Sequence, residues 1–558
     1  MDNPRLLLAF VVSLGIIILY SQLLQWRYPQ RGQNQGKGGA TASAVATPGA
    51  ETPGASEAAA PAATSAGQKA PSAAQAASAG APARLIKVET NFYEAVLSSQ
   101  GARLVSFRLK KYRESDAPDS PYYEMVRRGE RLPMGMLVTR AGVRVDDSGL
   151  DYAVEGPDQI TVTPQSPAAV TFIATTADGL RLEKTFSFSD SSYVFDLKAN
   201  ASAESGAAPD GIGLSMSQPL KALAGFRDFP TLQADVKGKV ISEAEKTLTK
   251  GIQPVSGPIT FAGFGDRYFF AAFMPQKPVD GTLTMTYAGD EADAVISFDK
   301  SASVASRVYM GPKELDVLEA VDPALSKAID FGLWGVIALP FLRALKVFYR
   351  IAPNYGVAII LLTVVVRLLV LPMSIKGQRS MMKMQRLQPQ VEKIREKFKG
   401  DQERLNREMV DLYKRNHVNP MGGCLPMVIQ LPVFFGLYYA LLNAIDLRQA
   451  PFIGWIKDLS APDCLPIAGM PAIPFTDLHG IPVLVLLMTL TALAQQWMSP
   501  RNPDPSQQKM MMYMPVVFSL IFLNLPAGLS LYYFSSNVLG VAQQFILNRE
   551  FKQYSPAT

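Results

Sequence analysis

The sequence contains very little cysteine and histidine. Its two cysteines, Cys424 and Cys464, are too few for a disulfide framework, and we expect two free thiols on opposite sides of a membrane. Its two histidines, His417 and His479, have no plausible nucleophile beside them and no metal-ligand spacing. The sequence therefore predicts no catalytic residue, no metal site, no cofactor and no enzymatic activity.

Aspartate and glutamate are absent from the predicted membrane spans. Charged residues make up 18% of the chain and hydrophobic residues 48%, a balance that suggests membrane and water-soluble parts in one protein. The apolar runs lie beyond about residue 329, whereas residues 84–320 have the composition of a water-soluble domain. A proton-coupled transporter needs a titratable relay inside its spans, so the missing acids argue against that class.

The first 83 residues divide into an apolar and a polar part. Residues 1–30 contain an apolar run from Leu6 to Leu24, which predicts an N-terminal transmembrane anchor. A cleaved secretory signal is the alternative, but the nearest A-x-A pattern, at 42–44, lies well past the end of the run. Residues 31–83 are mostly Ala, Gly, Ser, Pro, Gln and Thr. Such a composition cannot bury a core, so we expect a disordered tether.

Residues 84–320 show the alternating pattern of β-strands. The segments 170–175 and 180–188 flank Asp178-Gly179, which is a favoured turn for a tight hairpin. The same alternation predicts further strands at 193–198, 268–273, 281–287 and 293–298. We therefore predict a large antiparallel β-sandwich.

The rest of the chain is mainly helical. Residues 321–354 comprise a linker and the apolar segment 329–350, which Pro340 and several cations interrupt. We expect an amphipathic helix in the membrane interface there, with a short spanning helix as the alternative. Within residues 355–550, further apolar runs predict membrane spans at about 355–373, 424–445, 481–497, 511–525 and 529–547.

A basic hairpin is predicted at residues 376–417. The segment has twelve Lys and Arg against six acids, an excess typical of cytoplasmic segments. Its apolar spacing predicts two antiparallel amphipathic helices, with Pro389 at a kink or at the start of the first and Gly400-Asp401 between them. Counting spans from this hairpin predicts six spans, both termini in the cytoplasm with a short tail at 551–558, and the β-domain outside.

A single cation, Arg367, lies within the apolar run 355–373. A charge near the middle of a membrane costs about 2.5 to 3.5 kcal/mol on insertion scales, so its presence needs a reason. Thr363 lies four residues earlier on the same helical face. One interpretation is that the guanidinium only snorkels to the headgroups, and the other is that it has a function inside the membrane.

The last apolar run also gathers polar and small residues on one face. At about 100° per residue, a single stripe contains Ser530, Tyr533, Asn537, Gly540 and Gln544. Tyr532 points roughly the opposite way. The stripe either bonds to neighbouring helices or, together with Arg367 and Gln430, lines a wet cavity that has one positive charge and no counter-acid.

Four long motifs resemble the YidC/Oxa/Alb family: VVVR at 364–367, NPMGGCLPMVIQLPVFFGLYYAL at 419–441, LRQAPF at 447–452 and PAGLSLYYFSSN at 526–537. The resemblance is strong over about 329–550 and architectural over 84–320. It implies a membrane protein insertase and chaperone of the bacterial inner membrane, of the Gram-negative six-span type. It further implies a periplasmic β-supersandwich and a five-helix core around a hydrophilic groove that opens to the cytoplasm and to lipid.

The resemblance also implies roles for individual residues. It implies a groove cation at Arg367 and substrate contacts at Thr363 and Tyr533. Polar residues of the neighbouring spans complete the predicted groove, namely Gln430, Ser530 and Asn537. The cytoplasmic hairpin is expected to contact substrates and targeting factors through Lys383, Arg386, Lys393, Arg395, Arg404 and Arg407.

The partners that the resemblance implies are nascent membrane proteins, the Sec translocon, the ribosome, targeting factors and membrane lipids, without sequence-specific nucleic-acid binding. Only eleven residues follow Leu547, so the long basic tail by which some relatives dock to ribosomes is missing. Two other functions stay open: a solute transporter or channel, and a periplasmic assembly factor with a membrane anchor. The latter predicts that residues 84–320 are essential, whereas an insertase needs mainly its core.

Overall fold

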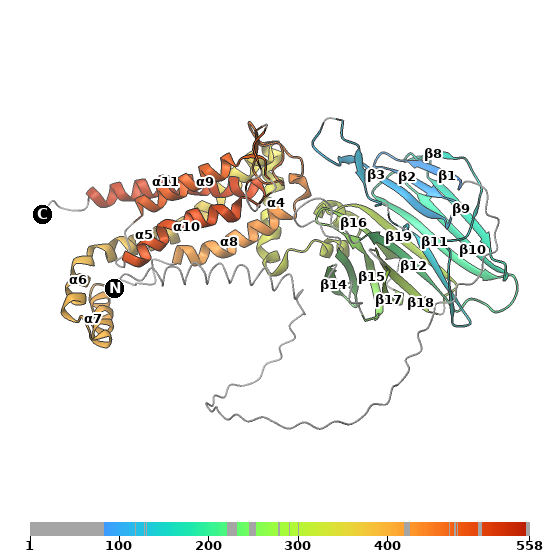
Figure 1. Cartoon of the computed structure of the whole chain (residues 1–558), viewed down its shortest axis with the longest axis horizontal. Helices are drawn as coiled ribbons and strands as arrows, with labels where there is room; N and C mark the ends of the chain where they lie inside the picture. The colour runs from blue at the N-terminus through green and yellow to red at the C-terminus, as the bar shows by residue number, and fades with distance from the viewer. Residues whose placement is uncertain are drawn as a thin grey trace, which may run out of the picture.

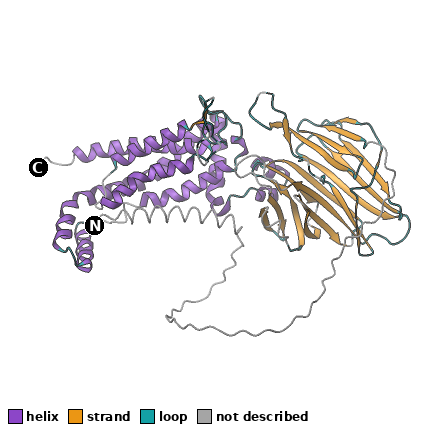
Figure 2. Cartoon of the chain, in the orientation of Figure 1, coloured by secondary structure: helices purple, strands orange, loops and turns teal. Residues whose placement is uncertain are grey.

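The computed structural model describes most of the chain after the predicted tether. The described residues are 83–117, 119–127, 129, 131–219, 231–244, 253–276, 279–288, 291–299, 301–417, 425–467, 469–471, 473, 476, 478–499 and 505–553. The anchor predicted at 1–30, the tether up to residue 82, Cys424 and the last residues of the tail lie outside them. Cys464 is a free thiol. Strands form one end of the molecule and helices the other (Figures 1 and 2).

The β-domain contains two main sheets. One has the strand order β4-β3-β2-β1-β8. The other follows the order β6-β5-β12-β18-β17-β15-β16-β19-β11-β10-β9-β7, and β13 joins it through β15 and carries β14. All of the strand pairs are antiparallel except β1 with β8. The strands of the domain are β1 Leu85–Glu89, β2 Tyr93–Ser98, β3 Arg103–Arg113, β4 Tyr122–Glu124, β5 Gly135–Arg140, β6 Val143–Asp146, β7 Ala153–Val154, β8 Gln159–Thr161, β9 Ala168–Thr175, β10 Leu180–Phe188, β11 Val194–Ala203, β12 Gly211–Pro219, β13 Thr231–Val236, β14 Lys239–Ala244, β15 Val255–Gly265, β16 Phe269–Pro275, β17 Val279–Ala288, β18 Glu291–Asp299 and β19 Ser303–Pro312.

The predicted hairpin around Asp178-Gly179 is confirmed. β9 and β10 pair in the register Thr175 with Arg181 and Ala168 with Phe188, and Gly179 has a φ of +76°, which a residue without a side chain adopts readily. The alternation along β10 places every second side chain in the core. The other predicted strands correspond to β11, β16, β17 and β18.

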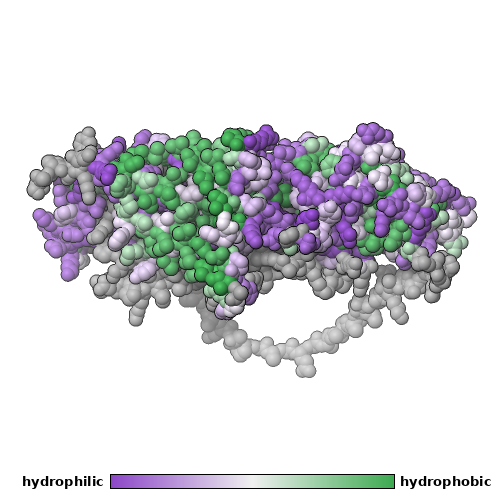
Figure 3. Space-filling view, turned by 90° about the horizontal axis from the view of Figure 1, so that it is seen from above, coloured by the Kyte–Doolittle hydropathy of each residue, from purple (hydrophilic) through white to green (hydrophobic). Residues whose placement is uncertain are grey.

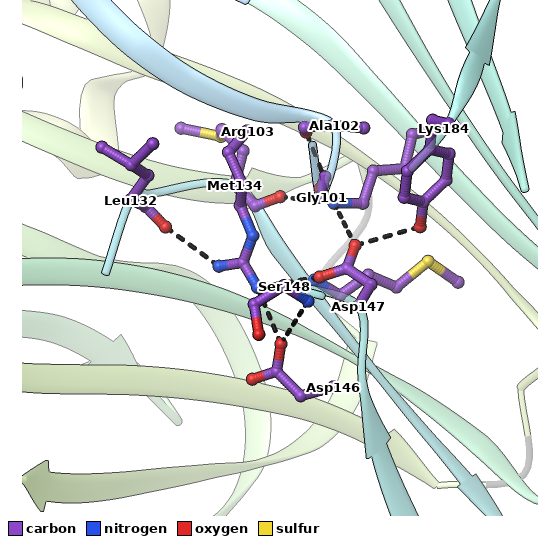
Figure 4. Close-up of polar contacts among 11 residues, drawn as sticks. Gly101, Ala102, Arg103, Leu132, Met134, Asp146, Asp147, Ser148 and Lys184 are labelled. Carbon is purple, nitrogen blue, oxygen red and sulfur yellow. Dashed lines mark hydrogen bonds and ion pairs between the residues drawn. The ribbon is translucent and has the colours of Figure 1, made fainter. Parts of the chain in front are cut away.

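A buried ionic network crosses the interior of the β-domain (Figure 4). The Lys184 and Asp147 side chains are both 0% exposed and form an ion pair. The Lys184 ammonium also donates to two backbone carbonyl oxygens at 2.8 Å. Arg103 donates to Asp147 at 2.8 Å and to Asp146 at 2.9 Å, and the Tyr152 hydroxyl donates to Asp147 at 3.1 Å. Two cations and two carboxylates therefore balance one another, with Asp146 at the exposed edge of the network, where its side chain is 44% exposed.

A short helical segment connects the β-domain to the bundle. It comprises α3 (Leu315–Val321), a 3-10 turn at Pro323–Ala328, another at Gly332–Trp334 and α4 (Gly335–Ile351). The sequence predicts an interruption at Pro340, but α4 continues through that residue. One face of α4 is buried and includes Leu342 and Leu345, whereas Val336 is 86% exposed. By length and composition, residues 332–351 could also cross a membrane.

Five long helices lie side by side as a bundle (Figure 1). They are α5 Tyr355–Arg386, α8 Leu425–Leu442, α9 Val483–Met498, α10 Pro505–Phe522 and α11 Ala527–Gln553. The structure thus has a helix at each of the five runs where the sequence predicts one. Figure 3 shows hydrophobic residues gathered over the bundle, with hydrophilic residues at its far end and over the β-domain. Exposed apolar side chains on the bundle include Leu369, Leu490, Trp497 and Leu520.

The first bundle helix is longer than the sequence predicts. α5 passes through Pro372 without ending and reaches Arg386, so the first residues of the predicted hairpin, from Lys376, extend this helix. Pro372 leaves only one backbone carbonyl without its usual donor, and neighbouring helices in a bundle help to tolerate this. The basic segment is therefore rigidly connected to the helix that carries Arg367.

The remaining hairpin consists of α6 (Gln388–Lys397) and α7 (Gln402–Arg415), which lie at the end of the bundle far from the β-domain (Figure 1). Pro389 lies at the start of α6, where proline costs no hydrogen bond. The Asp401 side chain accepts from the Arg404 backbone nitrogen at 3.0 Å and caps α7. Both predicted boundaries are confirmed. The two helices pack through a small apolar cluster of Leu387, Val391 and Tyr413, flanked by Met384, Met409 and Leu412.

Candidate functional site

Arg367 is held by one residue of the last helix. Its Nε donates to the Ser536 Oγ at 2.8 Å, and its Nη2 donates to the Ser536 carbonyl oxygen at 2.6 Å. Neither acceptor carries a charge. Helices α5, α8, α9 and α10 contain no acid, and the only acid of α11 is Glu550 near its end. Glu550 lies 3.6 Å from Arg379, another residue of α5.

Gln430 reaches the same face of α11 from the other side. Its Nε2 donates to the Tyr532 hydroxyl at 3.0 Å, and the Tyr532 side chain is almost completely buried. Tyr532 and Ser536 lie one helical turn apart, so they share one face. Helices α5 and α8 therefore both bond to this face of α11, through Arg367 and Gln430 respectively.

A second polar contact joins α5 and α11 further toward the basic hairpin. The Gln543 amide nitrogen donates to the Ser374 Oγ at 3.0 Å and to the Gln378 Oε1 at 3.0 Å. Ser536 and Gln543 are seven residues apart, which places them on the same face of α11. We define the polar seam as Arg367, Ser374 and Gln378 of α5 with Tyr532, Ser536 and Gln543 of α11.

The stripe that the sequence singles out on α11 faces another helix. Asn537 donates to the Met488 carbonyl oxygen of α9 at 3.2 Å. Gly540 lies against Gln495, since a Cβ at Gly540 would stand 2.7 Å from its amide nitrogen. These contacts bond α11 to α9 through Asn537 and Gly540.

Three other predicted groove residues, Thr363, Ser530 and Tyr533, pack within the bundle. Thr363 is 0% exposed, and its hydroxyl donates to the Ile359 carbonyl oxygen of its own helix at 2.7 Å. Ser530 is also 0% exposed, and its Oγ has no hydrogen-bond partner among the described residues. Tyr533 packs edge-to-face on Phe434 and Phe522, with ring centroids 5.4 and 4.9 Å apart. Of the predicted set, the structure brings only Arg367 and Gln430 to the Tyr532–Ser536 face.

Sequence reasoning missed Tyr532, Ser536 and Gln543. Their spacing of four and seven residues is a helical-face signal equal to that of the stripe. The sequence favours the stripe because that face of α11 contains more polar residues than the face with Tyr532, Ser536 and Gln543. Periodicity identifies the faces of a helix, but it does not say which face meets which neighbour.

The loop between α8 and α9, residues 443–482, is here called the outer loop, and its described residues bond to the helix ends nearest the β-domain. Within it, the Asp463 carboxylate accepts from the backbone nitrogens of Leu484 at 2.5 Å and Val485 at 3.3 Å, so it caps α9. The Trp455 indole donates to the same carboxylate at 2.8 Å. The Ala527 nitrogen, at the α10–α11 turn, donates to the Ala461 carbonyl oxygen at 2.7 Å. The outer loop therefore ties three helix ends together.

The opposite end of the bundle carries the basic hairpin. Of its six predicted contact residues, Arg395 is half-buried. The other five are exposed, namely Lys383, Arg386, Lys393, Arg404 and Arg407. Arg407 pairs with Glu403 at 2.8 Å, and Arg404 with Asp401 at 3.3 Å. Exposed pairs of this kind contribute about 0.3 to 0.5 kcal/mol each, so they leave the cations accessible to partners.

Two family models match the chain. The model described as "YidC periplasmic domain" matches residues 85–344, and that described as "60Kd inner membrane protein" matches residues 347–554. A curated relative from Syntrophobacter fumaroxidans, named membrane protein insertase YidC, is 37% identical over 485 residues, covering 83% of this chain and 86% of the relative. The chain belongs to the YidC family.

Further YidC relatives match over their whole length. The protein of the same name from Citrifermentans bemidjiense is 35% identical over 98% of this chain and 99% of its own. A solved structure described as an active YidC insertase has 18% identity and a TM-score of 0.36 over 85% of this chain and 95% of its own. As a YidC family member, the chain is a bacterial inner membrane protein, and its β-domain is periplasmic.

Proposed function

We propose that the chain is a membrane protein insertase and chaperone in which Arg367 receives an acidic part of the incoming substrate. The observation that carries the proposal is that, among the residues that the structure describes, the hydrogen-bond partners of Arg367 are the two uncharged oxygens of Ser536, in helices without a nearby acid. The insertase activity is supported by curated relatives of that name. The task is one of binding and release, so it needs no chemical reaction.

A substrate carboxylate can compete for Arg367. At a separation of about 4 Å and an effective dielectric near 20, a carboxylate attracts a guanidinium by about 4 kcal/mol. A typical hydrogen bond to a charged group contributes about 1.5 to 3 kcal/mol. Ser536 makes two such bonds, which together contribute about 3 to 6 kcal/mol. A guest carboxylate and Ser536 therefore compete for the guanidinium on nearly equal terms, and Ser536 regains it when the guest leaves. The bound state is favourable without being permanent.

The two ends of the bundle suggest the direction of entry. The outer loop closes the periplasmic end through Asp463 and Ala461, whereas the polar seam continues through Gln543 toward the basic hairpin. We propose that a short hydrophilic tail enters from the cytoplasm along this seam while its apolar segment leaves into lipid. Contact with polar side chains lowers the cost of placing backbone groups within hydrocarbon.

The topology and partners follow the same proposal. Six spans place both termini in the cytoplasm, and α4 lies in the periplasmic interface. The exposed cations of α6 and α7 meet targeting factors and the ribosome first, and the Sec translocon acts as a second partner. The comparisons favour this function over a transporter or an anchored periplasmic factor, because the named relatives are insertases over most of the chain.

Site-specific crosslinking to a ribosome-bound nascent membrane protein tests the proposal. We expect crosslinks from Gln430 and Tyr533 to the translocated tail, and weaker ones from the buried Thr363. A probe at Leu368, which neighbours Arg367 in sequence but is 61% exposed on the outside of α5, is the matched control and should contact mainly the apolar segment. An absence of crosslinks from all three predicted positions would overturn the placement of the substrate path.

A further inference from the structure

The motif LRQAPF at 447–452 has no part in the proposed groove. It begins at the end of the 3-10 turn Ile445–Leu447, directly after α8, and it lies where the helical bundle meets the β-domain. Its side chains contact both parts of the protein. We define the joint as residues 446–452.

On the β-domain side, the joint inserts an arginine over two aromatic rings. The Arg448 guanidinium carbon lies 5.3 Å from the ring centroid of Tyr123 and 5.6 Å from that of Phe269. The two rings stack on each other with centroids 3.8 Å apart. Both distances fall within the reach of about 6 Å of a cation–π interaction.

Two hydrogen bonds extend this contact. Arg448 donates through Nη2 to the Glu114 carbonyl oxygen at 3.2 Å, and Gln449 donates through Nε2 to the Arg113 carbonyl oxygen at 3.2 Å. Gln449 has a φ of +57°, a conformation that residues other than glycine adopt uncommonly. The backbone therefore bends so that both side chains reach the end of β3.

On the bundle side, the joint packs against the first residues of α5. The Phe452 ring lies so close to Gly356 that a Cβ there would stand 2.0 Å from a ring carbon. The Asn354 amide nitrogen points at the carbonyl oxygens of Pro451 and Phe452, both at 3.4 Å. The Asn354 side chain also accepts from the Val357 nitrogen at 3.1 Å and so caps α5. Gly356 is required here because any side chain would push Phe452 away.

A group of ion pairs connects the joint to α3 and α4, the helices that follow the β-domain. Lys346 of α4 lies 2.7 Å from Asp316 and 3.4 Å from Glu314, both at the start of α3, and 3.8 Å from Asp446 of the joint. The Lys346 side chain is only 13% exposed. Partial burial makes such a bridge less sensitive to salt than an open surface pair.

We propose that residues 446–452 are a positioning joint that locks the periplasmic domain onto the outer end of α5, with Arg448 as its central contact. The β-domain and the helix that carries Arg367 then move as one body. A partner or substrate that pushes on the β-domain acts directly on the outer end of α5. The joint does not depend on the proposed insertase function.

Distance measurements between two spin labels test the joint in the full chain. One label is placed at Lys198 on β11 and the other at Ile467 in the outer loop, both exposed, with Cys424 and Cys464 replaced by serine. The starting protein should give one narrow distance distribution. With Arg448→Met, the undocked population should grow by roughly 5- to 30-fold, because the cation–π contact over two buried rings is lost.

Lys457→Met is the matched control, because Lys457 is an exposed cation of the same loop, and it should leave the distribution unchanged. Tyr123→Leu should broaden the distribution as Arg448→Met does, and the double variant should add little to either change. Hydrogen exchange of β10 and β11 reports whether the β-domain stays folded. If Arg448→Met does not fold, Arg448→Lys and Gln449→Ala are measured in the same way. A narrow, unshifted distribution in the folded Arg448 variants would overturn the proposal.

Discussion

Two cationic sites in this protein differ in what balances their charge. In the β-domain, Lys184 and Arg103 lie against the carboxylates of Asp147 and Asp146 (Figure 4). In the bundle, Arg367 lies against the hydroxyl and carbonyl oxygens of Ser536. The first site is neutral as a whole, whereas the second keeps a net positive charge. A balanced site holds a structure together, and an unbalanced one retains its attraction for an anion that arrives later.

The two sites also differ in how deeply their cations are buried. Lys184 is completely enclosed, and its ammonium is satisfied by two carbonyl oxygens and Asp147, so nothing further can approach it. Arg367 is only partly buried. The cost of burying a charge is met in the β-domain by fixed partners. In the bundle the described partners of Arg367 are two uncharged oxygens of Ser536, so no fixed carboxylate balances the charge.

The largest expected effect comes from breaking the balanced site. Asp147→Asn leaves Lys184 and Arg103 with one carboxylate between them, and breaking a buried pair typically costs about 3 to 5 kcal/mol. We expect a loss of that size in the free energy of unfolding of the β-domain, measured on the full chain in detergent by pulse proteolysis across a urea series. Asp158→Asn is the control, because Asp158 forms an exposed pair with Arg84, and it should change the value by no more than about 1 kcal/mol. Equal effects of the two substitutions would contradict the comparison.

The second prediction concerns the unbalanced site. Arg367→Glu should lower the insertion of a substrate with an acidic translocated tail, relative to one with a neutral tail, by about tenfold or more, which corresponds to about 1.4 kcal/mol. Arg367→Ala should have a smaller effect of the same sign. The measurement is the protected fraction of each substrate after insertion into vesicles. Equal insertion of both substrates by the Glu variant would sink the electrostatic role of Arg367.

A third prediction uses pH to sharpen the contrast. Burial lowers the pKa of Lys184 to about 8, because the attraction of Asp147 offsets only part of the desolvation. Burial likewise lowers the pKa of Lys313, which donates to Gln233, to about 8. In the unfolded chain both lysines keep their protons up to their ordinary pKa near 10.5. The unfolded state therefore binds more protons between these values, and stability should rise with pH.

From pH 8 to 9, the free energy of unfolding of the β-domain should increase with a slope of at most about 1.4 kcal/mol per pH unit for each lysine. Near pH 10 the buried tyrosines of the domain, whose pKa burial raises, oppose this increase, because only the unfolded chain then loses their protons. The same urea series, repeated at each pH, measures the slope. Lys313→Met should reduce the slope, because it removes one of the two lysines that lose their proton more easily in the folded state. The substitution is otherwise mild, since the hydrogen-bond partner of Lys313 is the neutral Gln233. An equal slope in the starting protein and in Lys313→Met would show that burial does not destabilise the Lys313 ammonium.

The smallest expected effect comes from Ser536→Ala. Arg367 loses one of its two contacts and keeps the carbonyl oxygen, so the bundle should lose about 1 kcal/mol of stability. Insertion of the acidic tail should not fall relative to the neutral tail, because the guest competes with Ser536 for Arg367 and one competing contact is gone. Ser519→Ala on α10 is the matched control, because its hydroxyl bonds only within its own helix. A collapse of acidic-tail insertion in Ser536→Ala would mean that Ser536 orients Arg367 for the guest.

Local signals in the sequence predicted much of the architecture. The apolar runs predicted the five bundle helices, Asp178-Gly179 predicted the β9–β10 hairpin, and Gly400-Asp401 predicted the start of α7. These features depend on residues that are close together in the chain. The sequence also showed that Arg367 has no acid within its own helix or the neighbouring spans, because that is a matter of composition.

The tertiary structure alone decided which residues meet. Ser536 lies 169 positions from Arg367 in the chain, and the periodicity of α11 favoured the stripe with Asn537, which faces α9 instead. The Lys184 network likewise joins β10 to β3 and to the residues after β6. Helical and strand periods reveal which side chains share a face, but packing chooses the partner of each face. Sequence therefore determined that this protein has an unpaired cation among apolar helices, and only the fold determined that Ser536 holds it.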